Sequence, residues 1–143
     1  MHQSSYLKRL TTITSTTIFF VLFIFNFEKL SFAEIKPNDK FSPLEVVDIQ
    51  LTSLQSNSND NKGIYQCWLF AHPENKKYTG PLEKFKSMLK SDMYEMLINH
   101  IENKIDIISA SENSATYRVT VLDDKKKYYQ FEWVVKKYDK SGP

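Results

Sequence analysis

Cysteine is nearly absent from this sequence, since Cys67 is the only one among 143 residues. A domain held together by disulfide bonds carries paired cysteines, so this chain has to be stabilised by its hydrophobic core. Catalysis by a thiol needs a neighbouring base, and the sequence places none beside Cys67. We therefore expect Cys67 to be a small buried side chain on the apolar face of a helix.

A charge excess is also missing from most of the chain. The formal net charge of +2 arises within residues 1–33, where Lys8, Arg9 and Lys29 outnumber Glu28. The rest of the chain carries equal numbers of basic and acidic side chains. A nucleic-acid-binding protein normally gathers a basic excess on one face, so the composition argues against a nucleic-acid partner.

No apolar run is long enough to span a membrane. The longest, residues 18–25, is far shorter than the roughly 20 residues that a spanning helix needs. Basic residues 8–9 precede this run, and the small-x-small sequence at 31–33 follows it. This pattern predicts a cleaved signal peptide over residues 1–33. We expect a mature protein that begins at Glu34, has no stable membrane span, and is exported to a periplasm, the extracellular space or an equivalent lumen.

Motifs that carry chemistry are missing as well. The chain has three glycines, and it contains neither a glycine-rich phosphate loop nor a G-x-S-x-G nucleophile elbow. Beyond residue 33 there are two histidines, His72 and His100, without a carboxylate at the spacing of a helical zinc site. The sequence therefore predicts no catalytic residue, no cofactor and no metal site.

A first helix is predicted after a polar lead-in over residues 34–42. Ser42 suits the N-cap, Pro43 the first helical position, and Glu45 completes a capping box. Apolar residues then recur at spacings of three and four and form one stripe, which predicts an amphipathic helix. The stripe consists of Leu44, Val47, Leu51 and Leu54.

A second helix is predicted after the polar run 56–61, with Asp60 or Asn61 as its cap. Its apolar stripe consists of Ile64, Cys67, Trp68 and Ala71. We expect Trp68 to belong to the core, with its indole N–H reaching the rim; stacking on a ligand is the less favoured alternative.

The stretch 71–81 is expected to be a loop between two helices. Pro73 would stop the second helix near Ala71, and Gly80 with Pro81 would serve as the N-cap and first position of a third helix. The buried face of that third helix is predicted to consist of Leu82, Phe85, Met88 and Leu89.

The rest of the chain alternates as strands do, apart from residues 93–97, which fit either a helical turn or an approach to the sheet. Three strands are expected, at 98–108, 116–122 and 128–135. The first is irregular enough to predict a bulge near Lys104, and residues 123–126 form a turn without glycine. The side chains expected on the inner face of the sheet are Tyr117, Val119, Val121, Tyr129, Phe131, Trp133 and Val135.

Three helices followed by a meander of strands predict a single α+β domain over residues 43–138, in which the helices pack on one face of a curved antiparallel sheet. Such a sheet leaves a concave opening in which a pocket is expected. Its apolar lining would include Tyr129, Phe131 and Trp133.

Several short sequences resemble the uncharacterised DUF4864 family over about residues 43–136. The most specific is the pattern P-E-N-x-x-x-T-G-P. The matching residues are Val46-Val47, Gln50-Leu51, Leu54-Gln55, Gly63-Ile64, Phe70-Ala71, Pro73-Glu74-Asn75, Thr79-Gly80-Pro81, Phe85, Phe131 and Trp133. The resemblance implies a small exported or membrane-associated protein with an NTF2-like or cystatin-like cone. It implies no activity and no catalytic residues.

Two features depart from that family. The family's glycine-containing turn is replaced here by residues 123–126. Family members also continue beyond the strand that contains Trp133, so the tail 139–143 is a candidate truncation point. A sheet that lacks its last strand would expose an edge able to recruit another chain.

The candidate site residues lie in the polar stretch after Pro73. Glu74, Asn75, Tyr78 and Thr79, with His72, are expected near the mouth of the cone. A pair such as His72 and Glu74 would resemble the acid–base equipment of an isomerase or a hydrolase. The favoured interpretation is that these polar side chains satisfy backbone groups of the loop.

Two functions from different classes remain open. The first is an exported, non-enzymatic module that binds a small apolar ligand or a partner protein through the concave side of the sheet. The second is an enzyme that acts on a small molecule in the same cavity with Glu74 or His72. A homodimer is also expected, by analogy with other cone-shaped sheets that pair through their outer faces.

Overall fold

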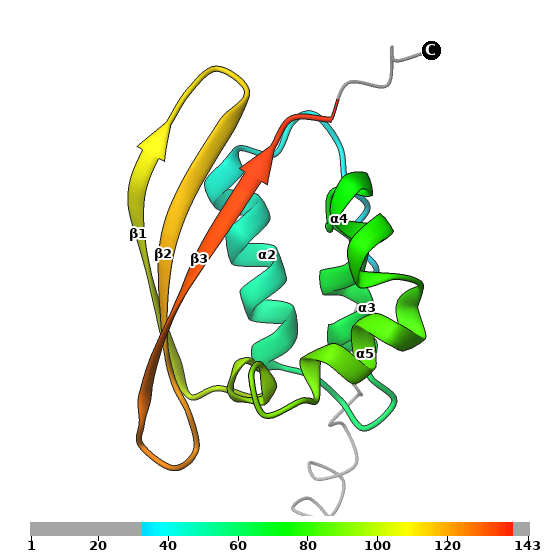
Figure 1. Cartoon of the computed structure of the whole chain (residues 1–143), viewed down its shortest axis with the longest axis vertical. Coiled ribbons are helices and arrows are strands. Elements are labelled where there is room, and N and C mark those ends of the chain that lie inside the picture. The colour runs from blue at the N-terminus through cyan, green and yellow to red at the C-terminus, as the bar shows by residue number, and fades with distance from the viewer. Residues whose placement is uncertain (1–32, 139–143) are drawn as a thin grey trace, which may run out of the picture. The chain divides into compact units, whose positions relative to one another are not determined.

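The computed structural model describes residues 33–138 (Figure 1). The expected signal peptide, up to residue 32, and the expected truncation point at 139–143 lie outside the described residues. The chain divides into two units, of which the second begins at Glu34. Among the described residues, no helix combines the length and the apolarity needed to cross a membrane.

The described part of the chain is an α+β domain, as predicted, with four α-helices where three were expected. The helices are α2 (Pro43–Gln55), α3 (Lys62–Leu69), α4 (Pro73–Thr79) and α5 (Leu82–Leu89), followed by a short 3-10 helix η1 (Glu95–Leu97). The strands are β1 (Glu102–Ala110), β2 (Ser114–Leu122) and β3 (Tyr128–Lys136). The ambiguous stretch 93–97 is thus helical at its end.

The strands form the expected antiparallel meander in the order β1-β2-β3. Ile105 lies opposite Val119, which in turn lies opposite Phe131. Two details of the prediction for β1 were wrong. The strand begins at Glu102, and its irregularity falls between Ile107 and Ser109, beyond the regular pairing at Lys104.

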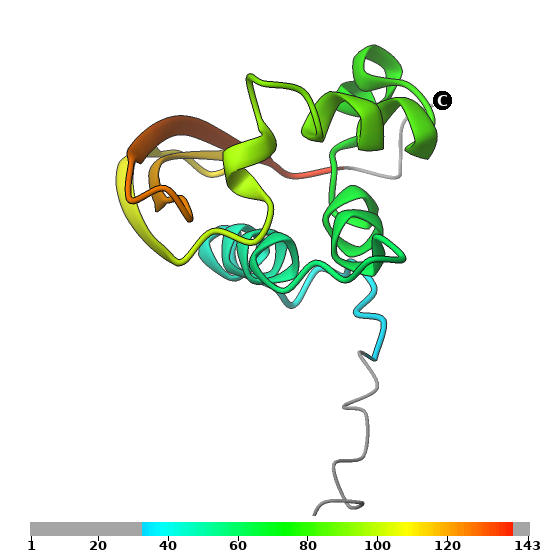
Figure 2. The ribbon, with the colours of Figure 1, turned by 90° about the horizontal axis from the view of Figure 1, so that it is seen from below.

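The elements are arranged with α2 at the centre. Figure 2 shows the sheet curling over α2 on one side, with α3 beside α2 on the other. α5 contacts α3 and α4 contacts α5, so these two helices form a further layer away from the sheet. Figure 1 shows the same order, with β1 at the outer edge of the sheet.

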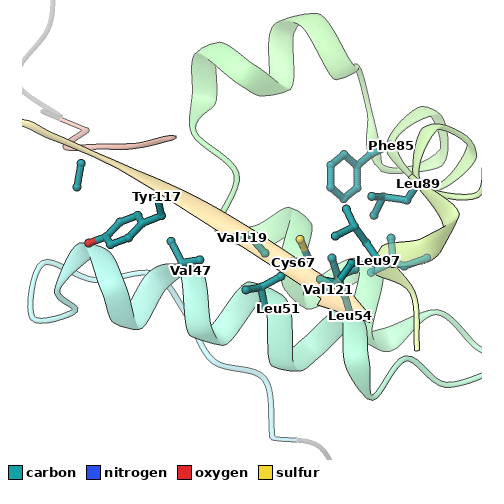
Figure 3. Packing of buried hydrophobic residues seen from close by; sticks show 12 residues of the cluster. Val47, Leu51, Leu54, Cys67, Phe85, Leu89, Leu97, Tyr117, Val119 and Val121 are labelled. Atoms are coloured by element: carbon teal, nitrogen blue, oxygen red, sulfur yellow. The ribbon is translucent and has the colours of Figure 1, made fainter. Parts of the chain in front are cut away.

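The core lies where α2, α3, α5 and β2 meet (Figure 3). The predicted inner face of β2 and most of the predicted helix stripes are buried there. The buried residues of these four elements are Val47, Leu51, Leu54, Ile64, Cys67, Phe85, Leu89, Ala115, Tyr117, Val119 and Val121. Leu44 was expected in the stripe of α2 but is about half exposed, because it lies in the first turn, before α2 enters the core.

The start of α2 has the predicted capping box. The Ser42 hydroxyl accepts the Glu45 N–H at 3.3 Å, and the Glu45 carboxylate accepts the Ser42 N–H at 2.7 Å. The cap predicted for α3 is only partly right. Asn61 occupies the N-cap position without a capping side-chain bond, while the Asp60 carboxylate accepts the Lys62 N–H at 3.4 Å and the Asn57 side chain accepts the Ile64 N–H at 3.1 Å.

The expected loop over residues 71–81 is wrong, because most of it forms α4. Pro73 is the first residue of that helix, a position where its missing N–H costs nothing, and α3 has already ended at Leu69. No residue of α4 is buried. The helix therefore has no apolar stripe, and hydrophobic periodicity could not reveal it.

Gly80 and Pro81 were also assigned one position out of register. Gly80 has a φ of 79° and ends α4, with its N–H donated to the Lys76 carbonyl. This left-handed conformation favours glycine. Pro81 is then the N-cap residue of α5, the position predicted for Gly80.

We expect Gly63→Ala to destabilise the domain. A Cβ atom at residue 63 would lie 2.0 Å from the Ser53 carbonyl oxygen and 2.9 Å from the Asn57 Cα atom, so the backbones of α2 and α3 would have to separate. The expected loss in unfolding free energy is about 1–3 kcal/mol, measured by urea denaturation. Lys77→Ala, on exposed α4, is the control and should change little. A Gly63→Ala variant as stable as wild type would contradict this close approach.

Candidate functional site

The four candidate residues Glu74, Asn75, Tyr78 and Thr79 all lie on α4. Glu74 and Asn75 are exposed, Thr79 is half-buried, and Tyr78 is 83% exposed. The Thr79 hydroxyl donates to the Asn75 carbonyl at 3.1 Å, a bond between successive turns of the helix. The four side chains thus share a helix that has no buried residue, and they do not surround an enclosed volume.

The His72 side chain caps α4. Its Nδ1 accepts the Glu74 backbone N–H at 3.2 Å, so this ring nitrogen bonds the backbone of Glu74. The ring also meets Tyr138 edge to face, with 5.7 Å between the ring centroids. These contacts give His72 a role in starting α4 and in placing it beside the end of the chain that follows β3.

Trp68 forms an aromatic and cationic cluster on α3 and α4. Its ring stacks on Tyr65, with centroids 6.4 Å apart, and the Lys76 ammonium lies 4.3 Å from the ring centroid. The same ammonium donates to the Leu69 carbonyl at 3.3 Å, and partial burial lowers the pKa of Lys76. Trp68 packs against the core, as predicted. The expectation that its indole N–H reaches the rim was wrong, because this N–H is buried, and it has no hydrogen-bond partner among the described residues.

The inner face of β3 carries three aromatic residues, Tyr129, Phe131 and Trp133, which we call the β3 aromatic row. All three are half-buried and pack against the core. Phe131 stacks on Tyr94, with centroids 6.3 Å apart. The row was predicted as the lining of a concave surface, and the structure places it on the side of the sheet that faces α2.

Gln50 connects this row to the helices. The Trp133 indole N–H donates to the Gln50 side-chain oxygen at 2.9 Å, and the Gln50 amide N–H donates to the Cys67 carbonyl at 3.1 Å. Gln50 is only 7% exposed, so both bonds lie in the interior. Gln50 was expected only as part of the family resemblance and without a role of its own, although a glutamine one position before Leu51 on the buried side of α2 is a signal for a buried polar contact.

Burial differs between the inner faces of β2 and β3. The inward residues of β2 are fully buried, whereas the inward residues of β3 are all half-buried and none is fully buried. α2 is the helix that makes the main contact with β3. The core is therefore closed over β2 and incompletely covered over β3.

Cys67 is buried at 2% exposure, as predicted. Burial raises the pKa of the Cys67 thiol to about 12, so the thiol stays protonated at neutral pH. Within residues 33–138, no group of three or more histidine, cysteine or acidic side chains is placed to hold a metal ion.

His100 is buried at the start of the sheet and bonded on both ring nitrogens. Nδ1 lies 2.8 Å from the Leu97 carbonyl, and Nε2 lies 3.0 Å from the Asn103 amide nitrogen. A carbonyl can only accept, so we assign the proton to Nδ1, with Nε2 accepting from Asn103. Burial lowers the pKa of His100, and the bond to Leu97 opposes this more weakly.

No protein-family profile, curated protein or solved structure matches this chain. Membership of the DUF4864 family therefore stays a prediction. In the structure, the P-E-N part of its pattern forms the first turn of α4, and Thr79, Gly80 and Pro81 connect α4 to α5. The pattern thus marks the two ends of one helix.

We expect Gln50 and Trp133 to be energetically coupled. Gln50→Leu leaves the half-buried Trp133 N–H without its acceptor and should cost about 1–3 kcal/mol of unfolding free energy. Adding Trp133→Phe removes that unpaired donor, so the double variant should lose less than the sum of the two single losses. Gln130→Leu, on the opposite face of β3, is the control, and its effect should add to that of Trp133→Phe. If the effects of the Gln50 and Trp133 substitutions add strictly, the hydrogen bond between them makes no net contribution to the free energy of unfolding.

His100 should make stability depend on pH above the range of the carboxylates. Its folded-state pKa lies below its ordinary value of 6.5, so the unfolded chain binds the proton more readily. The stability due to neutral His100 is present above about pH 6.5 and is lost as pH falls through the folded pKa. The measurement is urea denaturation at a series of pH values from about 7.5 down to about 5, which bracket the ordinary pKa of histidine. The free energy of unfolding should decline over this range in wild type and change less in His100→Gln.

Glu45 and Asp60 also have lowered pKa values, because of hydrogen bonds with Ser42 and Ser58 respectively. Their ordinary pKa values are 4.5 and 3.8. The contributions of these two carboxylates to folding stability are therefore lost at a lower pH than that of His100, and the two effects can be told apart. If the free energy of unfolding of wild type and of His100→Gln fell equally steeply with pH across the histidine range, the attribution of this pH dependence to His100 would be contradicted.

Proposed function

We propose that this chain is an exported, non-enzymatic binding module that takes a small apolar ligand on the β3 aromatic row. The observation that carries the proposal is the half-burial of Tyr129, Phe131 and Trp133, beside a β2 face that is fully buried. Binding sites for small molecules are lined mainly by apolar and aromatic side chains with a few polar groups. The proposal includes an NTF2-like or cystatin-like cone, and it puts the β3 aromatic row along the opening of that cone.

Polar groups near the row support this function. Gln50 bonds Trp133 and also the Cys67 carbonyl, so the row is held at a defined position relative to α3. A partner protein that presents an apolar side chain to the row would be bound by the same aromatic side chains.

Export is the second part of the proposal. The segment that would follow a cleavage after Ala33 is held to the domain at its start. The Gln66 side-chain amide bonds both the N–H and the carbonyl of Ile35, at 2.8 and 2.7 Å, and Phe41 packs on Phe70 with centroids 5.8 Å apart. A domain that starts at Glu34 would therefore keep these contacts.

An enzyme that uses Glu74 or His72 is less well supported. Glu74 is exposed, and the His72 Nδ1 is already engaged with the backbone of α4. An acid–base pair gains most of its effect in a site that excludes water. No observation on α4 supplies such a site.

The test uses protein secreted from the full chain, with an intact mass that should correspond to a first residue of Glu34. Titration with a fluorescent long-chain fatty acid should give saturable energy transfer from tryptophan, because Trp133 belongs to the proposed surface. Tyr129→Ser should weaken binding by about tenfold. Tyr128→Ser, at the next residue on the outer face, should leave it unchanged.

Three outcomes would contradict the proposal. They are an intact Met1 on membrane-bound protein, the absence of saturable binding, and equal effects of the two tyrosine substitutions. Hydrolysis of an ester probe that is lost in both Glu74→Gln and His72→Gln, in protein that still melts cooperatively, would establish the enzyme instead.

A further inference from the structure

β1 forms one edge of the sheet and carries exposed apolar side chains. The sheet order gives it a single neighbour, β2, among the described strands. Ile107 is 64% and Ile108 48% exposed. An edge strand presents unpaired backbone N–H and C=O groups, and natural proteins usually protect such edges with charges, prolines or bulges. This edge has one bulge, at its far end, and its charged residues, Glu102, Lys104 and Asp106, alternate in sign along the strand.

We propose that β1 pairs antiparallel with β1 of a second copy of this chain, so that two three-stranded sheets form one continuous sheet. Closed twofold symmetry is the commonest arrangement of identical subunits, and it places the same patch on both sides of the interface. This interface is distinct from the β3 aromatic row, because β3 forms the opposite edge of the sheet (Figure 1).

The bulge restricts the register. Regular pairing of β1 with β2 runs from Glu102 to Ile107 and shifts before Ser109. A twofold axis at Ile105 uses this regular segment best, because it places Ile105 opposite itself and Asn103 opposite Ile107 of the second copy. An axis at Ile107 would run into the bulge, and an axis at Asn103 would leave only residues 102–104 of the strand paired.

The charges on the outer face fit the same register. Asp106 lies opposite Arg118, and Arg118 lies opposite Glu132, so one row alternates in sign across the three strands. An axis at Ile105 places Lys104 of the second copy next to Asp106 and continues this alternation. Opposite charges directly across an antiparallel pair stabilise it, and like charges destabilise it.

Lys104 and Asp106 can replace their ion pair within one chain by ion pairs between two chains. In the single chain the Lys104 ammonium lies 2.8 Å from the Asp106 carboxylate, and both side chains retain substantial exposure. An exposed ion pair of this kind contributes little to the stability of the monomer. In the pair of chains the same two side chains form two contacts across the axis, one on each side of it.

The test is a charge exchange between two variants, read by sedimentation velocity. Lys104→Glu puts two acidic groups together at each contact, and Asp106→Lys puts two basic groups together. Each variant alone should dimerise about tenfold more weakly than wild type or worse, because two contacts change from attraction to repulsion. An equimolar mixture should dimerise again, because both contacts between unlike variants join opposite charges.

A second measurement fixes the register. Ile105→Cys should form a disulfide-linked dimer under mild oxidation, because residue 105 meets its own copy at the axis. The buried Cys67 thiol, whose pKa is raised to about 12, should not react. Lys125→Glu, in the exposed turn between β2 and β3, is the matched charge-reversal control and should dimerise like wild type.

Thermal melting of each variant separates loss of pairing from loss of folding. The proposal is overturned if the wild-type chain stays monomeric at its highest soluble concentration, or if folded Lys104→Glu dimerises as well as wild type. It is also overturned if the mixture of folded variants does not recover, or if Ile105→Cys does not cross-link. None of these outcomes depends on the binding of an apolar ligand.

Discussion

The burial of α2 on two sides is the constraint on which the rest of this domain depends. Val47, Leu51 and Leu54 have no exposed surface, and they lie in one buried cluster with side chains of β2 and α3 (Figure 3). Burial of such aliphatic side chains contributes on the order of 2 kcal/mol each. A helix held in this way sets the separation of the sheet from α3. Gly63 in α3 has no side chain because the two helix backbones meet there.

This central position of α2 explains why the two sides of the domain differ. The inner face of β2 is fully buried, whereas β3, which α2 contacts, keeps a half-exposed aromatic row in which Gln50 fixes the position of Trp133. At the other end, α5 attaches to α3 through Phe85 and Leu89, and α4 attaches through contacts that bury none of its residues. Function is therefore better sought on the incompletely covered side of β3 than on α4.

Much of the fold could be predicted because particular residues have strong local preferences. The capping box of Ser42 and Glu45, the stripe from Val47 to Leu54 and the alternation from Tyr117 to Val121 each specify an element within a few positions. α4 escaped prediction because a helix without a buried face leaves no periodic pattern. The candidate site was predicted from polar residues that are close together in the sequence. On a short exposed helix such residues point outward in several directions, so they do not form one site.

The sequence by itself determined the class of the domain, the order of its strands and the identity of most core residues, because these follow from short-range periodicity and turn chemistry. Only the tertiary structure decided which apolar faces are covered and which polar side chains are enclosed. Gln50, Trp133 and Cys67 lie far apart along the chain, and Asp106, Arg118 and Glu132 lie opposite one another on three strands. Their contacts depend on the packing of α2 and on the strand register, which no local pattern records.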